Sequence, residues 1–347
     1  MFSFHTRVCL LTASLLTGLI SAQPLQQAAL VPGADMILTV QMSALNQSPF
    51  MQALNAAQSP RIQALKTRQQ AQIQNAIGLK EEDVLAYMLS MKLPEALFET
   101  AFEPTPEILQ TLQFVLAVEL ATPLTLDKLK EGVELLREDT PGNAEVDTVE
   151  LGGQTVLQLS TTTEAGDTPF DNAYISLSDS GTIVLLTLNE ASLTAAHRRL
   201  DRRESATPGA ELQAALNALD GNQIRMALLL PASARRSLAA SVQQMSAADP
   251  MMGMFAAPFA GLSSITFSGN ATDRLAMALN IDIGNDMAAQ QLAAMARNFG
   301  PSLGGAAGPV ARKITPEAIG TVLRLSGWVS PEDLRPLNLQ MDLDSLE

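Results

Sequence analysis

Residues 1–22 are predicted to form an export signal, and the mature chain expected after its removal contains no cysteine. Arg7 gives the signal its positive start, residues 8–20 are uncharged and mostly apolar, and Ser21-Ala22 offers a cleavage site before Gln23. Exported proteins are often stabilised by disulfides, but the single cysteine, Cys9, lies inside the signal. The mature chain of about 325 residues must therefore be stabilised by an apolar core alone, which its length allows.

The mature chain is strongly acidic. Loss of Arg7 leaves 21 basic side chains against 36 acidic ones, a formal net charge of −15, so nucleic acid is not an expected partner. After the signal, no stretch approaches the roughly twenty uncharged apolar residues of a membrane span, so no transmembrane segment is expected in the mature chain. The sequence predicts an exported protein, periplasmic or secreted, since the signal specifies translocation only.

Apolar periodicity and turn residues predict strands and helices along the whole mature chain. Strands are predicted at 36–42, 113–120, 146–151, 155–160, 173–178, 182–188, 223–230, 263–270, 274–283 and 321–329. Helices are predicted from Pro49 onward and at 60–77, 125–137, 189–200, 210–219, 233–245 and 286–299, with a short one after Ser330. The segment 81–92 fits a helix or a strand equally well.

This succession predicts an α+β fold of two similar lobes, each an antiparallel sheet with helices packed on one face. The polar stretch at 202–209 is interpreted as the hinge. The predicted parts are therefore a signal peptide at 1–22, a first lobe at 23–203 and a second lobe at 204–347. The segments 182–200 and 274–299 share the order of strand and Ala/Leu-rich helix, which favours an internal repeat.

Three short sequences accompany this pattern: Val31-Pro32-Gly33-Ala34-Asp35 before the first strand, Ser48-Pro49-Phe50 at a helix start, and Gly261-Leu262-Ser263-Ser264-Ile265. With the export signal, they give a chain that resembles a group of uncharacterised exported bacterial α+β proteins of the domain-of-unknown-function type. The resemblance covers most of the mature chain and implies fold and compartment. It brings no catalytic motif with it.

Few catalytic chemistries are open to this chain. His197 is the only histidine of the mature chain, and no Gly-x-Ser-x-Gly motif is present to seat a serine nucleophile. Zinc and copper sites normally take histidine or cysteine ligands, and one histidine cannot build them. The acidic residues do not form the alternating loop of a calcium site. We therefore expect no metal and no cofactor. A carboxylate pair, as in glycoside hydrolysis, is the remaining enzymatic alternative.

Two segments are candidate binding sites. The segment 251–259 gathers Met251, Met252, Met254, Phe255 and Phe259 between prolines, and methionine-rich surfaces adapt to varied apolar partners. The alternative, which we favour, is that the segment forms a short buried helix in the core of the second half. Arg198, Arg199, Arg202 and Arg203 concentrate positive charge and could bind an anionic partner. A solvated helix end explains these arginines more simply.

The sequence therefore predicts a protein that is not an enzyme. By elimination, it is interpreted as an exported binding or accessory protein of the cell envelope or the secreted fraction. The alternative is a carrier of an apolar ligand or lipid that uses segment 251–259. A metal-independent, carboxylate-based hydrolase is the third hypothesis. The partner is then an unidentified protein or apolar ligand.

Overall fold

The computed structural model describes residues 29–99, 108, 111–138, 144–161, 172–202, 208–219, 223–249, 251, 253, 256–299 and 308–334. The chain forms two compact units. The first comprises Met1–Asn46, Leu65–Pro94 and Pro104–Ala210, and the second comprises Gln47–Ala64, Glu95–Glu103 and Glu211–Glu347. The main division thus falls near residue 210, and two short segments from the N-terminal half belong to the second unit.

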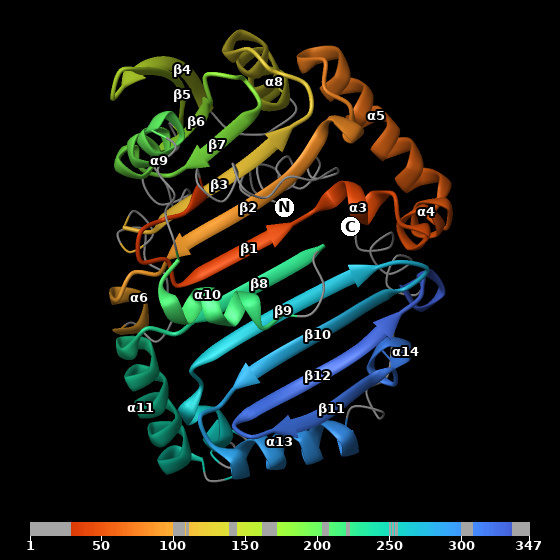
Figure 1. Ribbon diagram of the computed structural model, residues 1–347, viewed down its shortest axis with the longest axis vertical. Coiled ribbons are helices and arrows are strands. Elements are labelled where there is room, and N and C mark those ends of the chain that lie inside the picture. The colour runs from red at the N-terminus through yellow and green to blue at the C-terminus, as the bar shows by residue number, and fades with distance from the viewer. Residues whose placement is uncertain are drawn as a thin grey trace. The chain divides into compact units, whose positions relative to one another are not determined.

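The first unit contains an antiparallel sheet with the strand order β1-β2-β3-β7-β6-β5-β4 (Figure 1). Its strands are β1 (Met36–Val40), β2 (Val84–Lys92), β3 (Gln113–Leu120), β4 (Ala144–Leu151), β5 (Gln154–Thr161), β6 (Asn172–Leu177) and β7 (Ile183–Thr187). Tight turns join β4 to β5 and β6 to β7. Gly153 and Gly181 have positive φ angles of 85° and 69° at these turns, as hairpin connections require.

The helices of the first unit lie on both faces of its sheet. They are α3 (Met42–Asn46), α5 (Pro60–Ile77, shared with the second unit), η1 (Glu81–Asp83), α8 (Leu126–Glu138) and α9 (Glu190–Arg202). His197 of α9 meets Ser176 on one face of β6, whereas Leu129 of α8 packs with Val118 on the opposite face of β3. The expected arrangement of helices on one face is therefore too simple for this unit.

The second unit contains an antiparallel sheet with the strand order β8-β9-β10-β12-β11. Its strands are β8 (Ile224–Leu229), β9 (Ser264–Ala271), β10 (Leu275–Asp282), β11 (Ile314–Ile319) and β12 (Val322–Val329). Its helices are α4 (Pro49–Ala56), α6 (Ala96–Glu99), α10 (Ala210–Asn217), α11 (Ala232–Ala248), η2 (Ala257–Gly261), α13 (Asp286–Phe299) and α14 (Gly308–Ala311).

The core of the second unit forms where α13 packs on its sheet. Leu292 and Ala293 of α13 join Ile283 and Leu323 in a buried cluster, and Phe259 of η2 packs against it. The N-terminal segment 47–64 is tied to this unit because the amide of Phe50 donates a hydrogen bond of 2.8 Å to the carbonyl of Thr272. These contacts make the second unit a compact α+β body.

The structure confirms the predicted α+β class, with antiparallel sheets and helices. It also resolves the ambiguous segment 81–92, which forms η1 followed by β2. The strand β11 was not predicted, because Pro316 lies within it. Proline is tolerated there since β11 is an edge strand of its unit's sheet and pairs with β12. Among the residues that the structure describes, no helix has the length and apolar character needed to cross a membrane.

Candidate functional site

A row of large aliphatic side chains crosses the sheet of the first unit. Strand register places Leu38 opposite Leu89, Leu89 opposite Leu116, and Leu116 opposite Leu186, which in turn faces Ile175. We call these five residues the leucine row. Paired residues in a sheet point to the same face, so the five side chains lie side by side across β1, β2, β3, β7 and β6. All five are only half-buried.

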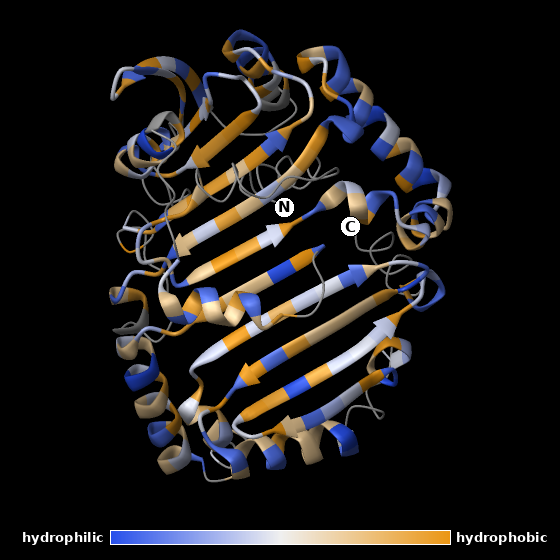
Figure 2. Cartoon of the chain, viewed as in Figure 1, coloured by the Kyte–Doolittle hydropathy of each residue, from blue (hydrophilic) through white to orange (hydrophobic). Residues whose placement is uncertain are grey.

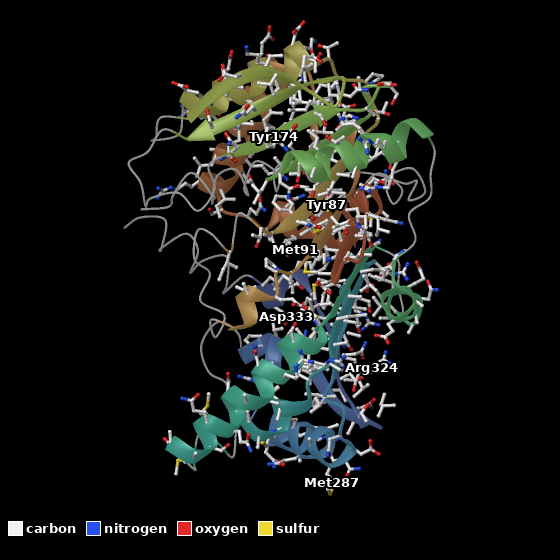
Figure 3. The ribbon with its side chains drawn as sticks, turned by 90° about the vertical axis from the view of Figure 1, so that its left-hand side faces the viewer. Tyr87, Met91, Tyr174, Met287, Arg324 and Asp333 are labelled. Carbon is white, nitrogen blue, oxygen red and sulfur yellow. The ribbon has the colours of Figure 1, made fainter. Side chains whose placement is uncertain are left out.

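A second apolar row lies beside the leucine row. Met36, Met91 and Phe114 face one another across β1, β2 and β3, two residues along from the leucine row, and are also half-buried. Figure 3 labels Met91 and Tyr87 on β2, four residues apart and so on the same face of the strand. Much of β1, β2 and β3 is coloured as hydrophobic in Figure 2. The half-buried face is therefore apolar over a wide area.

The opposite face of the same strands is more deeply buried. Along β2, buried Ala86, Met88 and Ser90 alternate with the half-buried residues of the other face. In β7, Leu185 is completely buried, whereas its neighbour Leu186 belongs to the leucine row. This buried face is the one on which α9 packs.

An antiparallel sheet with one face in water normally carries polar residues on that face. The half-buried face here carries leucine, isoleucine, methionine and phenylalanine instead. One end of it is covered, because Leu124 and Leu129 form a buried cluster with Val118 and Leu157, joined by Ile77 of α5. Leu116 and Ile175 of the leucine row pack against this cluster and stay only partly buried. The leucine row and the Met36–Met91–Phe114 row keep a partly exposed apolar surface that can accept an apolar guest.

Burial changes the ionisation of two side chains in this sheet. Burial raises the pKa of Tyr87, which packs at the covered end of the half-buried face, to about 12, so its phenol stays neutral. Burial also raises the pKa of the Glu119 carboxyl, on the opposite face of β3. The Oε2 atom of Glu119 is buried without a hydrogen-bond partner. The half-buried face itself thus presents no charge along its two apolar rows.

The described residues of the predicted methionine-rich segment differ in their exposure. Met251 is 70% exposed, whereas Phe259 packs against the core cluster of the second unit. Met252, Met254 and Phe255 lie outside the described residues. Another exposed apolar side chain of this unit, Met287 at the start of α13, was missed by the sequence analysis although it is 77% exposed. Figure 3 shows Met287 projecting away from the second unit.

The described arginines of the predicted arginine patch also differ in their exposure. Arg198 is exposed, but its neighbour Arg199 is only 8% exposed, and burial lowers the pKa of its guanidinium. Arg199 therefore does not lie on a solvated helix end. The Arg202 side chain and Arg203 lie outside the described part of the chain.

His197, one of the two histidines of the chain, is buried. His197 Nε2 lies 2.7 Å from Ser176 Oγ, and Ser176 is completely buried beneath α9. A nucleophilic serine must reach its substrate, so this pair is suited to core packing rather than to acyl transfer. Among the described residues, no group of three or more histidine, cysteine, aspartate or glutamate side chains is placed to hold a metal ion.

The only tryptophan, Trp328, lies close to two cations in the second unit. Lys313 Nζ lies 3.9 Å from the centre of the Trp328 ring, and Arg274 Cζ lies 5.0 Å from it. Lys313 also forms an ion pair of 2.5 Å with Asp333, whose carboxylate accepts hydrogen bonds from the amide and hydroxyl of Ser330. These contacts fix the end of β12 and give the second unit a fluorescent reporter.

Comparisons with known proteins do not assign the chain to a family. No protein-family model matches the chain, and no curated protein matches it. A solved structure, crystal form I of TP0453, is similar with a TM-score of 0.41 and 11% identity, over 92% of this chain and 98% of that one. Similarity at this level carries no argument about function. The resemblance to uncharacterised exported proteins remains a prediction.

Proposed function

We propose that this protein is an exported, non-catalytic binding protein that holds a long-chain apolar ligand against the leucine row. One observation carries the proposal: five large aliphatic side chains lie in register across five strands and are all half-buried. Neighbouring strands are about 4.8 Å apart, so the row extends for about 19 Å. That length suits an extended acyl chain lying across the strands.

The chemistry of the face favours a flexible, uncharged ligand segment. Leucine, methionine and phenylalanine side chains give non-directional contacts, and methionine adapts its shape to the guest. No charge lies along the two apolar rows. An acyl chain of a fatty acid or a phospholipid has this character, and its polar group would remain at the edge of the face.

The proposal that the protein is not an enzyme is supported by the small number of side chains that could act as nucleophile or general base. The only histidine of the mature chain, His197, is buried against Ser176. A serine-directed phosphonate probe should therefore leave Ser176 unlabelled in the folded protein. Labelling of Ser176 would contradict the non-catalytic proposal. The exported part is supported by the pattern of residues 1–22.

A second candidate function is a protein-interaction role for the methionine-rich segment. Exposed Met251 favours it, because the side chain projects into solvent rather than into the core. Replacing Met252, Met254 and Phe255 with serine should then abolish partner capture in intact cells while the protein stays folded. Unfolding of that variant would assign these residues to the core instead.

The ligand proposal is tested by titrating the purified protein with a fluorescent long-chain fatty acid. We expect saturable binding that weakens at least tenfold in the double variant Leu89→Ser, Leu116→Ser. Each substitution removes apolar contact worth on the order of 1 kcal/mol, and 1.4 kcal/mol corresponds to a tenfold change in affinity. Displacement by unlabelled phospholipid then distinguishes the two sources of the acyl chain.

The matched control is Leu65→Ser, which makes the same chemical change at an exposed leucine of α5. It should bind the fatty acid like the unaltered protein. If the double variant binds normally, or if Leu65→Ser loses binding to the same extent, the leucine row is not the binding surface.

A further inference from the structure

Two cations lie against an exposed indole in the second unit. Trp328 is 38% exposed although it lies within β12, which Figure 1 shows between β10 and β11. Lys313 Nζ and Arg274 Cζ both lie within 5.0 Å of the centre of its ring. The whole chain has a formal net charge of −14, so these residues make a local positive surface on an acidic protein.

Strand pairing brings the three side chains to one place. Lys313 immediately precedes β11, and a Cβ atom at Gly327 of β12 would lie 2.5 Å from the Lys313 carbonyl oxygen. The Lys313 backbone therefore packs directly beside the position of Trp328. On the other side, Trp328 pairs with Ala276 of β10, two residues after Arg274. The Ala276 side chain is exposed and too short to cover the indole, so Arg274 can reach the ring.

The two cations differ in the partners that they already have. Lys313 forms an ion pair of 2.5 Å with Asp333, which holds its ammonium in place. Arg274 forms no ion pair with any residue that the structure describes, and the preceding Asp273 accepts a hydrogen bond of 2.9 Å from the Thr272 hydroxyl instead. The Arg274 guanidinium thus keeps its N–H donors for an external acceptor. Its contact with the indole limits its motion, which lowers the entropic cost of binding.

A guanidinium held beside a second cation suits a phosphate group. Arginine pairs with phosphate through two parallel hydrogen bonds, and a lysine ammonium adds attraction as a point charge. The exposed indole places an apolar surface next to these charges, which favours a phosphate carried on an organic group.

We propose that Arg274, Lys313 and Trp328 form a binding site for a phosphate ester, with Arg274 as its direct ligand. The ester is the headgroup of an anionic phospholipid or a small soluble molecule, and both present the same chemistry. The site lies in the second unit and does not depend on the leucine row.

The fluorescence of Trp328 gives the test, because it is the only tryptophan of the chain. We expect glycerol phosphate or phosphatidylglycerol vesicles to change this fluorescence saturably. Sodium chloride of the same ionic strength and vesicles of phosphatidylcholine, whose headgroup has no net charge, should not. A response to glycerol phosphate assigns the site to soluble esters, and a response to phosphatidylglycerol vesicles alone assigns it to the lipid headgroup. Equilibrium dialysis and vesicle cosedimentation measure the same binding without the fluorophore.

The variant Arg274→Gln should bind roughly tenfold more weakly, because a hydrogen bond between two charged groups is lost. Arg274 is exposed, so this variant should fold normally, as far-UV circular dichroism can verify. The matched control is Arg312→Gln, which removes the same charge from an exposed arginine next to Lys313 in the chain. It should bind like the unaltered protein.

The proposal is overturned if neither probe binds, or if phosphatidylcholine vesicles bind as tightly as phosphatidylglycerol vesicles. It is equally overturned if Arg274→Gln binds as tightly as the unaltered protein, or if Arg312→Gln loses binding to the same extent as Arg274→Gln.

Discussion

Leu185 and Leu186 are adjacent on β7 and point to opposite faces of the sheet, so they form a matched pair. Leu185 is fully buried opposite Ala117 and Ser176, whereas Leu186 is half-buried in the leucine row. We predict that Leu185→Ala lowers the free energy of unfolding by about 3–4 kcal/mol, as for leucine truncation in a packed core. Leu186→Ala should cost only about 1–2 kcal/mol, because its side chain loses less burial.

The assay is urea unfolding of delipidated protein, followed by far-UV circular dichroism. Trp328 lies in the second unit, so a transition seen by circular dichroism but not by tryptophan fluorescence belongs to the first unit. Added fatty acid should raise the unfolding midpoint of the unaltered protein and of Leu185→Ala. It should raise the midpoint of Leu186→Ala by much less, because that variant lacks part of the binding surface.

Equal costs for the two substitutions would refute this reasoning. If Leu186→Ala destabilises the protein as much as Leu185→Ala, the leucine row is ordinary core that the chain itself covers. If fatty acid stabilises Leu186→Ala as strongly as the unaltered protein, the ligand binds elsewhere.

Three further predictions concern single positions. Gly181→Ala should destabilise the first unit by about 2 kcal/mol or more in urea unfolding, because Gly181 has φ +69° and an added Cβ would lie 2.5 Å from the Leu124 carbonyl oxygen. Glu119→Gln should raise stability at pH 7 by on the order of 1 kcal/mol. Burial raises the Glu119 pKa, so the charged carboxylate penalises folding as pH rises through that pKa, and the gain should disappear near pH 4. Asp333→Asn should lower stability at pH 7 by about 1 kcal/mol and change Trp328 fluorescence. Burial alone would raise the Asp333 pKa, but hydrogen bonds from Lys313 and Ser330 hold it below its usual value, so the difference should vanish as pH falls through that lowered pKa.

Local sequence patterns predicted most of the secondary structure. The helix expected at 60–77 is α5, and Gly78 follows it with φ +74°, as a helix-ending glycine does. Asn189 caps α9 as expected, because its side chain accepts a hydrogen bond from the amide of Ser192. These features depend on residues close in sequence, which is why a single chain reveals them.

The leucine row could not be read from local patterns, because it depends on the register of five strands. One signal was present: β2 and β3 are almost continuously apolar, which in an antiparallel sheet indicates cover on both faces. The exposure of Met287 was also hidden, since an apolar residue in the first turn of a helix can face either the core or solvent.

Native mass spectrometry of the mature protein, purified gently from its own host, tests the central proposal most directly. We expect an adduct with the mass of a fatty acid or phospholipid, lost in the double variant Leu89→Ser, Leu116→Ser and retained in Leu65→Ser. A bare protein that also fails to take up added fatty acid and phospholipid would contradict the proposal that the leucine row holds an apolar ligand.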